Sequence, residues 1–183
     1  DIKYIGQFLE NIKNKVVQLD SLSCSIFFKY IIKKKNTIIE KPDTIYLFKS
    51  IKNKTEIKNT IKTHIYDGAA LSKFLFWIKK NFKNKKISEM SAQEKLLTFR
   101  KQNKTFKSLS FPTISGTRSN GAIIHYKANK KSNKILKKGD IYLVDSGGQY
   151  NFGTTDVTRT ISLENNQHRI KNIFTRVLKG HIA

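Results

Sequence analysis

The sequence predicts an α+β chain in which helices come first, an antiparallel sheet follows, and a further helix ends the chain. Apolar residues recur every three to four positions through much of the first half, which is the period of an amphipathic helix. From Leu109 onward the apolar runs are short and are separated by Asn-Gly, Gly-Asp and Gly-Gly pairs, a pattern typical of strands joined by tight turns. Helices and strands that are segregated along a chain indicate the α+β class.

Residues 1–48 are predicted to be the end of a separate α/β unit. Apolar spacing predicts a helix over Ile5–Ile12, and Val16–Leu19 is a short apolar strand. A second helix is expected over Ser21–Ile32. After a proline turn, the apolar run Ile45–Phe48 is predicted to be a strand.

Residues 49–183 are predicted to form a larger domain that opens with two helices. Asn53 and Glu56 have the spacing of a capping box, which predicts the start of a long helix. Ser91 and Glu94 have the same spacing and predict the start of the second helix. The apolar positions expected to face the core from the long helix are Ile57, Ile61, Ile65, Leu71, Leu75 and Ile78.

Four strands and a last helix complete the predicted domain. The strands are expected at Ser110–Ser115, Ala122–Tyr126, Ile141–Asp145 and Val157–Leu163. The helix is expected to begin near Gln167, because the residues after it again show helical spacing. Its apolar positions are Ile170, Ile173, Phe174, Val177 and Leu178.

Positive charge is the most unusual property of the composition. The chain has 36 basic and 13 acidic residues, a net charge of +23. Such a charge can bind nucleic acid through phosphate neutralisation, but only five of the basic residues are arginine, which makes bidentate contacts to bases and phosphates. Lysine, isoleucine and asparagine all have A/T-rich codons, so an A/T-biased genome explains the composition without a nucleic-acid ligand. We therefore expect a solvated basic surface.

Other bulk properties predict a folded cytoplasmic protein. The hydrophobic fraction of 38% is enough to build a core. No apolar run approaches the eighteen or so residues of a membrane span, and no secretory leader opens the sequence. The single cysteine, Cys24, excludes an internal disulfide and suits a reducing compartment.

Two aspartates flank a glycine-rich turn between the last predicted strands. Asp145 follows the apolar residues Ile141 to Val144, and Asp156 precedes the next strand. A carboxylate at the end of an apolar strand is costly to desolvate unless a positive group compensates it, and a divalent cation is one such group. The alternative is that both residues cap turns beside Gly147 and Gly153. Spacing alone favours the turn interpretation.

The histidines and Arg159 have two interpretations each. His125 closes the predicted strand Ala122–Tyr126 and either makes a structural hydrogen bond or moves protons in a cleft. His181, one turn after Leu178, has the same two interpretations. Arg159 is either a surface residue or the partner of a metal-binding carboxylate. His64 and His168 are expected to be structural and surface residues.

Several sequence blocks, taken together and in order, resemble the long, eukaryotic-type Xaa-Pro aminopeptidases of the pita-bread metallopeptidase superfamily. No single block is specific, but their combination from about residue 49 onward is. The blocks are Lys52-Asn53 with Glu56, His64-Ile-Tyr-Asp-Gly-Ala-Ala-Leu71, Ile87-Ser-Glu-Met-Ser-Ala92, Ser110-Phe-Pro-Thr-Ile-Ser115, Asn120-Gly-Ala-Ile-Ile-His-Tyr126, Asp145-Ser-Gly-Gly-Gln-Tyr150, Gly153-Thr-Thr-Asp-Val-Thr-Arg-Thr160 and Phe174-Thr-Arg-Val-Leu-Lys-Gly-His-Ile-Ala183.

The resemblance implies a fold and a set of site residues. Residues 49–183 would be the front part of a pita-bread catalytic domain, and 1–48 the end of a non-catalytic, ribonuclease-H-like domain of the creatinase type. Asp145 would bind one metal ion, and Asp156 would bridge two. His125 and His181 would be the active-site histidines that face the substrate.

The resemblance also implies an activity and its cofactors. It implies hydrolysis of peptides with proline in second position, two divalent metal ions, usually manganese, and a homodimer in the complete protein. Neither a membrane nor nucleic acid is an expected partner. Because the chain opens without methionine and closes within a helical pattern, the family's remaining ligands, one histidine and two glutamates, are expected beyond Ala183. This fragment alone is therefore expected to be inactive.

Two alternatives for the activity remain, and one residue departs from the family pattern. A pita-bread protein that has lost catalysis would act as a binding module, although Asp145, Asp156 and His125 oppose this. A prolidase restricted to dipeptides is the nearer alternative. Arg118 stands where the family usually has glycine, which is expected to stiffen or redirect its loop.

Overall fold

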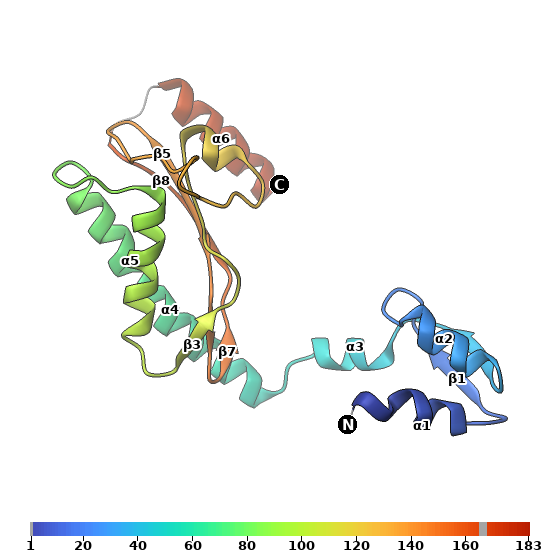
Figure 1. Ribbon diagram of the computed structural model, residues 1–183. Coiled ribbons are helices and arrows are strands. Elements are labelled where there is room, and N and C mark those ends of the chain that lie inside the picture. The colour runs from blue at the N-terminus through green and yellow to red at the C-terminus, as the bar shows by residue number, and fades with distance from the viewer. Residues whose placement is uncertain (1, 165–167) are drawn as a thin grey trace. The chain divides into compact units, whose positions relative to one another are not determined.

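The computed structural model describes residues 2–164 and 168–183. The chain divides into two compact units, Asp1–Asn53 and Lys54–Ala183 (Figure 1). The helices and strands of the first unit are η1 (Ile2–Tyr4), α1 (Ile5–Asn11), β1 (Val16–Leu19), α2 (Ile26–Lys33), β2 (Thr37–Glu40) and α3 (Thr44–Ser50). Those of the second unit are α4 (Lys54–Asn81), α5 (Glu89–Lys101), β3 (Phe106–Leu109), β4 (Ile114–Thr117), η2 (Arg118–Ala122), β5 (Ile141–Ser146), β6 (Gly148–Tyr150), β7 (Gly153–Thr154), β8 (Val157–Ser162) and α6 (His168–Ile182).

The first unit is a small β-α-β arrangement. β1 and β2 pair in parallel, and α2 connects them, which is the connection that parallel strands require. Ile31 and Ile32 on α2 and Leu19 on β1 are its buried apolar residues. The predicted helix over Ile5–Ile12 and the strand Val16–Leu19 are confirmed.

One prediction for the first unit is wrong, and another is confirmed only in part. The run Ile45–Phe48 lies in helix α3 rather than in a strand, because Asp43 accepts a hydrogen bond from the backbone nitrogen of Ile45 at 2.9 Å and so caps a helix. The helix predicted over Ser21–Ile32 starts only at Ile26, where the side chain of Ser25 accepts the N–H of Phe27.

Helices α4 and α5 lie side by side and cover one face of the long strands of the second unit (Figure 1). Phe74 and Ile78 on α4 and Leu96 on α5 are fully buried. They belong to one hydrophobic core with Tyr142 and Val144 of β5, both also 0% exposed. Helix α6 lies on the other side of these strands in Figure 1.

A long bent hairpin links two three-stranded antiparallel sheets. The first sheet has the order β4-β5-β8 and the second β3-β6-β7. β5 continues into β6 through Gly147, while β7 returns into β8 through Thr155 and Asp156. The bend requires glycine, because a Cβ atom at Gly147 would overlap the carbonyl oxygen of Thr155 and lie 2.8 Å from its carbonyl carbon. The sequence pattern predicted only a turn at Gly147-Gly148, so β6 and β7 were missed.

The buried face of α4 differs from the predicted face in its first half. Ile57, Ile61 and Ile65 are 49%, 57% and 64% exposed. The buried positions there are the polar residues Thr63 and Asp67, four residues apart. Hydrophobic spacing predicted the wrong face because a polar cluster is buried at this end of the helix. The apolar positions Leu71 and Ile78 are buried as expected, and Leu75 is partly buried.

Helix α5 begins three residues earlier than predicted. Its N-cap is Ser88, whose hydroxyl accepts the N–H of Ser91 at 3.2 Å, so Ser91 occupies the third helical position instead of the cap. Glu89 is then the first residue of the helix and is fully buried.

The predicted strands had mixed outcomes. Ile141–Asp145 and Val157–Leu163 correspond to β5 and β8, which confirms them. The predicted strand Ser110–Ser115 is wrong over most of its length, since β4 begins at Ile114. Ala122–Tyr126 contains no strand. Its first residue, Ala122, ends the 3-10 helix η2, and His125 has a positive φ of 54°, which a strand excludes.

Helix α6 confirms the last predicted helix, although the expected start near Gln167 lies outside the described residues. Its apolar residues Ile173, Phe174, Val177 and Leu178 are 47% to 69% exposed. Within the part of the chain that the structure describes, no helix has both the length and the apolar composition that a membrane crossing needs.

Candidate metal centre

Strand β5 places Asp145 on the face that points away from the helical core. Tyr142, Val144 and Ser146 are buried toward α4 and α5, whereas Asp145 is half-buried. Side chains alternate across a strand, so Asp145 projects to the opposite face. The apolar alternation of β5 therefore fixes both the depth and the direction of this carboxylate.

Asp156 lies on the same face as Asp145. Asp145 pairs with Thr158 of β8, and Asp156 is two residues before Thr158. Residues two apart on a strand share a face, and such diagonal neighbours lie about 7–8 Å apart between Cα atoms. The bend at Gly147 thus brings two carboxylates to one side of the hairpin.

Asp145 retains an unsatisfied oxygen. Its Oδ1 atom is buried and has no hydrogen-bond partner. A buried carboxylate oxygen without a donor is costly, and a metal ion is a group that would satisfy it. The donor set of two carboxylates fits part of a site for hard divalent ions. In residues 2–164 and 168–183, no cluster of three or more His, Cys, Asp or Glu side chains is placed to hold a metal ion.

Asp145, Asp156 and His125 line one cavity of about 430 Å³. His125 reaches it from the loop after η2, so three of the four predicted site residues come together. The other lining residues are Phe111, Pro112, Ile114 and Lys127. The cavity therefore combines two carboxylates and an imidazole with an apolar wall and one cationic side chain.

The loop that carries His125 is held by the buried carboxylate of Glu89. Glu89 Oε2 accepts hydrogen bonds from Tyr126 Oη at 2.9 Å, Asn120 Nδ2 at 3.0 Å and the backbone nitrogen of Lys134 at 3.0 Å. Burial and the nearby Glu89 carboxylate raise the pKa of Tyr126, against the hydrogen bond of its hydroxyl with Ser132. Sequence patterns gave no indication of this role, because Glu89 had been placed before the predicted start of its helix.

The backbone at Arg118 has a conformation that favours glycine. It has a positive φ of 53°, which glycine adopts without strain and other residues rarely adopt. Its Nε atom lies 3.5 Å from Asp140 Oδ2, and its Nη2 donates to the carbonyl of Ile135 at 3.3 Å. These two contacts anchor the loop at Arg118.

The fourth predicted site residue, His181, is exposed near the end of α6 and does not line this cavity. His168 is the exposed first residue of the same helix, and His64 is exposed on α4, where its Nδ1 lies 2.8 Å from the carbonyl oxygen of Thr60. Arg159 is exposed and pairs with Val144, so it projects to the face opposite Asp145. The structure brings none of these four to the two aspartates.

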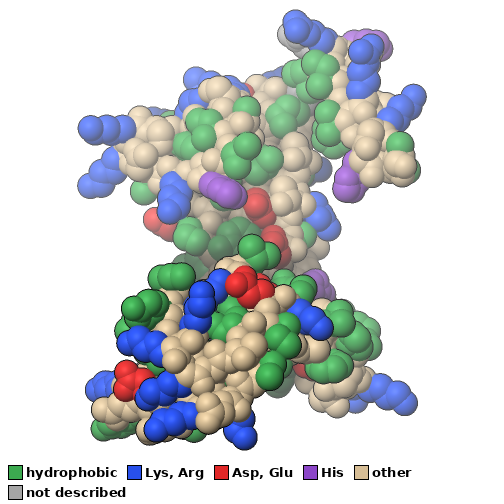
Figure 2. Space-filling model, turned by 90° about the vertical axis from the view of Figure 1, so that its right-hand side faces the viewer, with side chains coloured by type: hydrophobic (Ala, Val, Ile, Leu, Met, Phe, Trp, Pro, Cys, Tyr) green, Lys and Arg blue, Asp and Glu red, His purple; other side chains and the backbone are tan. Residues whose placement is uncertain are grey.

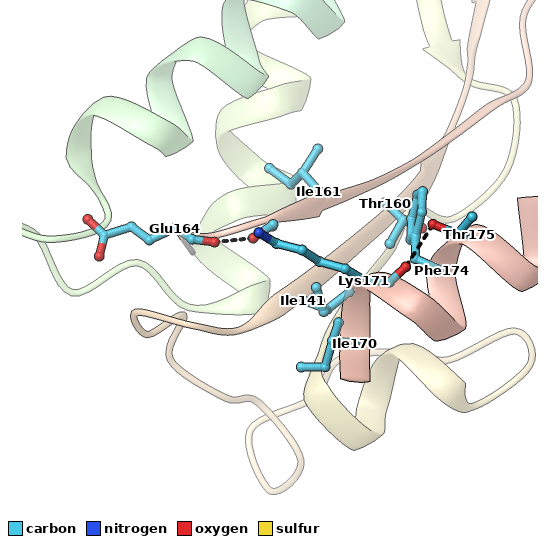
Figure 3. A pocket seen from close by; sticks show the side chains of 9 residues that line it. Ile141, Thr160, Ile161, Glu164, Ile170, Lys171, Phe174 and Thr175 are labelled. Carbon is cyan, nitrogen blue, oxygen red and sulfur yellow. Dashed lines mark hydrogen bonds between the residues drawn. The ribbon is translucent and has the colours of Figure 1, made fainter. Parts of the chain in front are cut away.

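A second cavity of about 430 Å³ lies between α6 and β8 (Figure 3). Figure 3 shows Ile141, Ile161, Ile170 and Phe174 around it. Glu164 is the acidic residue of its lining and forms ion pairs with Lys83 and Lys138. This lining contains a single carboxylate, which is paired with lysines, and no histidine, so the candidate metal site is the cavity of Asp145 and Asp156.

An α+β domain that presents two carboxylates and a histidine at one cavity is a candidate metal-dependent hydrolase domain. The chain belongs to metallopeptidase family M24, whose sequence profile matches residues 58–183. The predicted resemblance and the predicted α+β, pita-bread fold of the second unit are thereby confirmed.

Curated relatives agree with the predicted resemblance. A probable Xaa-Pro aminopeptidase P of Laccaria bicolor is 47% identical over 148 residues, which cover 80% of this chain and 23% of the relative. Xaa-Pro aminopeptidase 1 of Dictyostelium discoideum is 47% identical over 153 residues, covering 81% and 24%. The chain thus spans about a quarter of the length of these relatives.

Solved structures show the same fold. The cytosolic X-prolyl aminopeptidase of Caenorhabditis elegans, described as having a di-nuclear active site, superposes with a TM-score of 0.80 at 28% identity. The match covers 91% of this chain and 28% of that one. A Xaa-Pro dipeptidase of Bacillus anthracis has a TM-score of 0.75 at 21% identity, covering 99% and 49%, which shows likeness of fold alone.

Proposed function

We propose that the full-length protein containing this chain is a metal-dependent aminopeptidase that releases the N-terminal residue from peptides with proline in second position. The observation that carries the proposal is the shared cavity of Asp145, Asp156 and His125, in which one buried oxygen of Asp145 lacks a donor. The names of the relatives at 47% identity supply the reaction class.

Asp145 and Asp156 would hold the metal ions through their carboxylate oxygens. Bound divalent ions would polarise the scissile carbonyl and favour ionisation of water near neutral pH. Manganese suits oxygen donors, and we propose it as the metal, in a homodimeric cytoplasmic enzyme. The family's other ligands, one histidine and two glutamates, are proposed to lie outside the described residues.

His125 would act on the substrate rather than on the metal. Its imidazole lines the cavity with the two aspartates and can donate a hydrogen bond or a proton at the scissile amide. The apolar side chains of Phe111, Pro112 and Ile114 form a wall that suits a proline ring. His181 remains a proposed second active-site histidine, although it does not line this cavity.

We also propose the domain division that the sequence predicts. Residues 1–48 would end a non-catalytic ribonuclease-H-like domain, and 49–183 would begin the catalytic domain. The parallel β1-α2-β2 arrangement and the compact unit Asp1–Asn53 support this division. Proteolysis of the full-length protein should cut between residues 48 and 54, and protection of this segment would contradict the division.

A prolidase restricted to dipeptides is the second candidate, since prolidases share the fold. The relatives with 47% identity are named aminopeptidases, which favours the first candidate. Cleavage of the tripeptide Arg-Pro-Pro separates the two, because a strict dipeptidase leaves it intact. A binding module would cleave neither a dipeptide nor this tripeptide.

The decisive experiment measures metal content and Arg-Pro-Pro hydrolysis in the full-length protein. Asp145→Asn and Asp156→Asn should both lower manganese content and activity, and Asp156→Asn more strongly if it bridges two ions. His125→Ala should slow turnover and leave the metal content unchanged. Glu10→Gln, an exposed carboxylate of the first unit, is the control and should change neither. Normal metal content and turnover in Asp156→Asn would refute the proposal.

A further inference from the structure

A buried ion pair joins the two helices behind the candidate metal centre. Asp67 on α4 and Arg100 on α5 are 1% and 0% exposed. Arg100 Nε donates to Asp67 Oδ1 at 2.7 Å, and Nη2 donates to Oδ2 at 3.0 Å, a bidentate pair with fixed geometry. Burial alone would raise the pKa of Asp67, but the hydrogen bonds and charge of Arg100 outweigh it and lower that pKa.

Hydrogen bonds join the pair to the bent hairpin at two places. Arg100 Nη2 donates to Ser146 Oγ on β5 at 3.1 Å, and Tyr150 Oη on β6 donates to Asp67 Oδ1 at 2.7 Å. Thr155, on the other arm of the hairpin, also helps to lower the pKa of Asp67. A single ion pair on the helices therefore holds one arm of the hairpin on both sides of the bend at Gly147.

Ser146 and Thr155 are chain neighbours of the two candidate metal ligands. Ser146 follows Asp145 in the chain, and Thr155 precedes Asp156. Ser146 and Thr155 are buried toward the helices, at 0% and 2% exposed, while the aspartates face the cavity. Because neighbours on a strand project to opposite faces, the ion pair holds the back of the segment whose front carries the carboxylates.

Stability alone does not account for this arrangement. Well-packed apolar residues often stabilise a core as much as a buried ion pair does. Arg100 Nη1 is buried and has no hydrogen-bond partner, which adds an energetic cost. What a bidentate pair supplies in return is directional restraint of the atoms it contacts.

We propose that Asp67 and Arg100 are positioning residues that set the separation and direction of the Asp145 and Asp156 carboxylates for metal binding. This inference rests on the proposed function, because it assumes that the two aspartates bind metal. Partners behind metal ligands orient them, and their loss typically lowers metal affinity by about 10- to 100-fold.

The test compares manganese affinity of variants of the full-length protein by isothermal titration calorimetry, with circular dichroism as the check on folding. Asp67→Asn and Arg100→Lys should weaken affinity by about 10-fold or more, because each breaks the bidentate geometry. Glu89→Gln is the matched control. This substitution also changes a fully buried carboxylate on a helix to an amide, but the contacts of Glu89 hold the His125 loop and not the hairpin bend. The manganese affinity of the Glu89→Gln variant should therefore stay at the wild-type value.

Two milder variants decide the question if Asp67→Asn does not fold. Ser146→Ala removes only the contact of Arg100 with β5, and Tyr150→Phe removes only the hydroxyl that donates to Asp67. Both should weaken manganese binding. Wild-type affinity in both variants would overturn the inference, as would an equal loss in Glu89→Gln.

Failure of the inference can be told apart from failure of the proposed function. If Asp145→Asn and Asp156→Asn lower affinity but Arg100→Lys and Ser146→Ala do not, the positioning role is wrong and the metal site stands. If Asp145→Asn and Asp156→Asn bind manganese as the wild type does, the proposed metal site is itself wrong.

Discussion

Replacing Gly147 by alanine should be among the most damaging changes of a single methyl group in this chain. An alanine Cβ would overlap the carbonyl oxygen of Thr155 and lie 2.8 Å from its carbonyl carbon. Carbon atoms in contact lie about 3.5–4.0 Å apart, so the two strands must separate by about 1 Å. Overpacking of this kind costs about 1–3 kcal/mol, and loss of the hydrogen bond from Ser110 Oγ to Thr155 O adds about 1 kcal/mol.

The expected loss of unfolding free energy is therefore roughly 2–4 kcal/mol. Guanidinium denaturation followed by circular dichroism measures it. Gly68→Ala is the matched control, because Gly68 is exposed inside α4 and nothing lies within 4 Å of its added Cβ. That change should stabilise the protein by about 0.5–1 kcal/mol. A Gly147→Ala protein as stable as the wild type would refute the close approach of the two strands.

Three further predictions concern the core, the ion pair and the basic surface. Phe74→Ala should cost about 3–5 kcal/mol, whereas Phe76→Ala, at 67% exposed, should cost under about 0.5 kcal/mol. Equal losses in denaturant melts would contradict the orientation assigned to α4. Because the pKa of Asp67 is lowered in the folded state, its carboxylate stabilises the fold above about pH 4, and this contribution is lost as the pH falls through the folded-state pKa. Asp67→Asn should therefore lose less melting temperature on acidification than the wild type does. The same acid dependence in both proteins would count against the buried pair. Lysine and arginine side chains are spread over the visible face in Figure 2. Electrophoretic mobility shifts at physiological salt should therefore show only weak binding of unrelated DNA duplexes. Tight, sequence-selective binding would contradict the interpretation of the charge as solvated surface.

The family of the chain could be predicted from the sequence, because it depends on short sequence blocks in a fixed order. The blocks around Asp145 and Asp156 indicated the family, and the family profile and relatives confirm it. Strand β5 was predictable because four consecutive apolar residues precede its aspartate. Helices α4 and α6 were predictable because long amphipathic spacing outweighs local ambiguity.

Apolar composition predicted the wrong structure for two segments in which specific hydrogen bonds decide the backbone conformation. The run Ile45–Phe48 has strand composition, but the cap formed by Asp43 makes it a helix. Ala122–Tyr126 is apolar enough for a strand, yet Tyr126 is drawn into a turn by its hydrogen bond with Glu89, 37 residues away. Composition carries no information about such a partner.

The sequence by itself determined the α+β class, the family and the candidate ligands, because these depend on residue types in a fixed order. Only the tertiary structure placed Asp67 and Arg100 behind those ligands, since they lie 33 residues apart on two helices and meet Ser146 a further 46 residues along. Their polar side chains interrupt the apolar pattern that sequence analysis follows. Only in the folded chain do their opposite charges meet and compensate each other in a core without solvent.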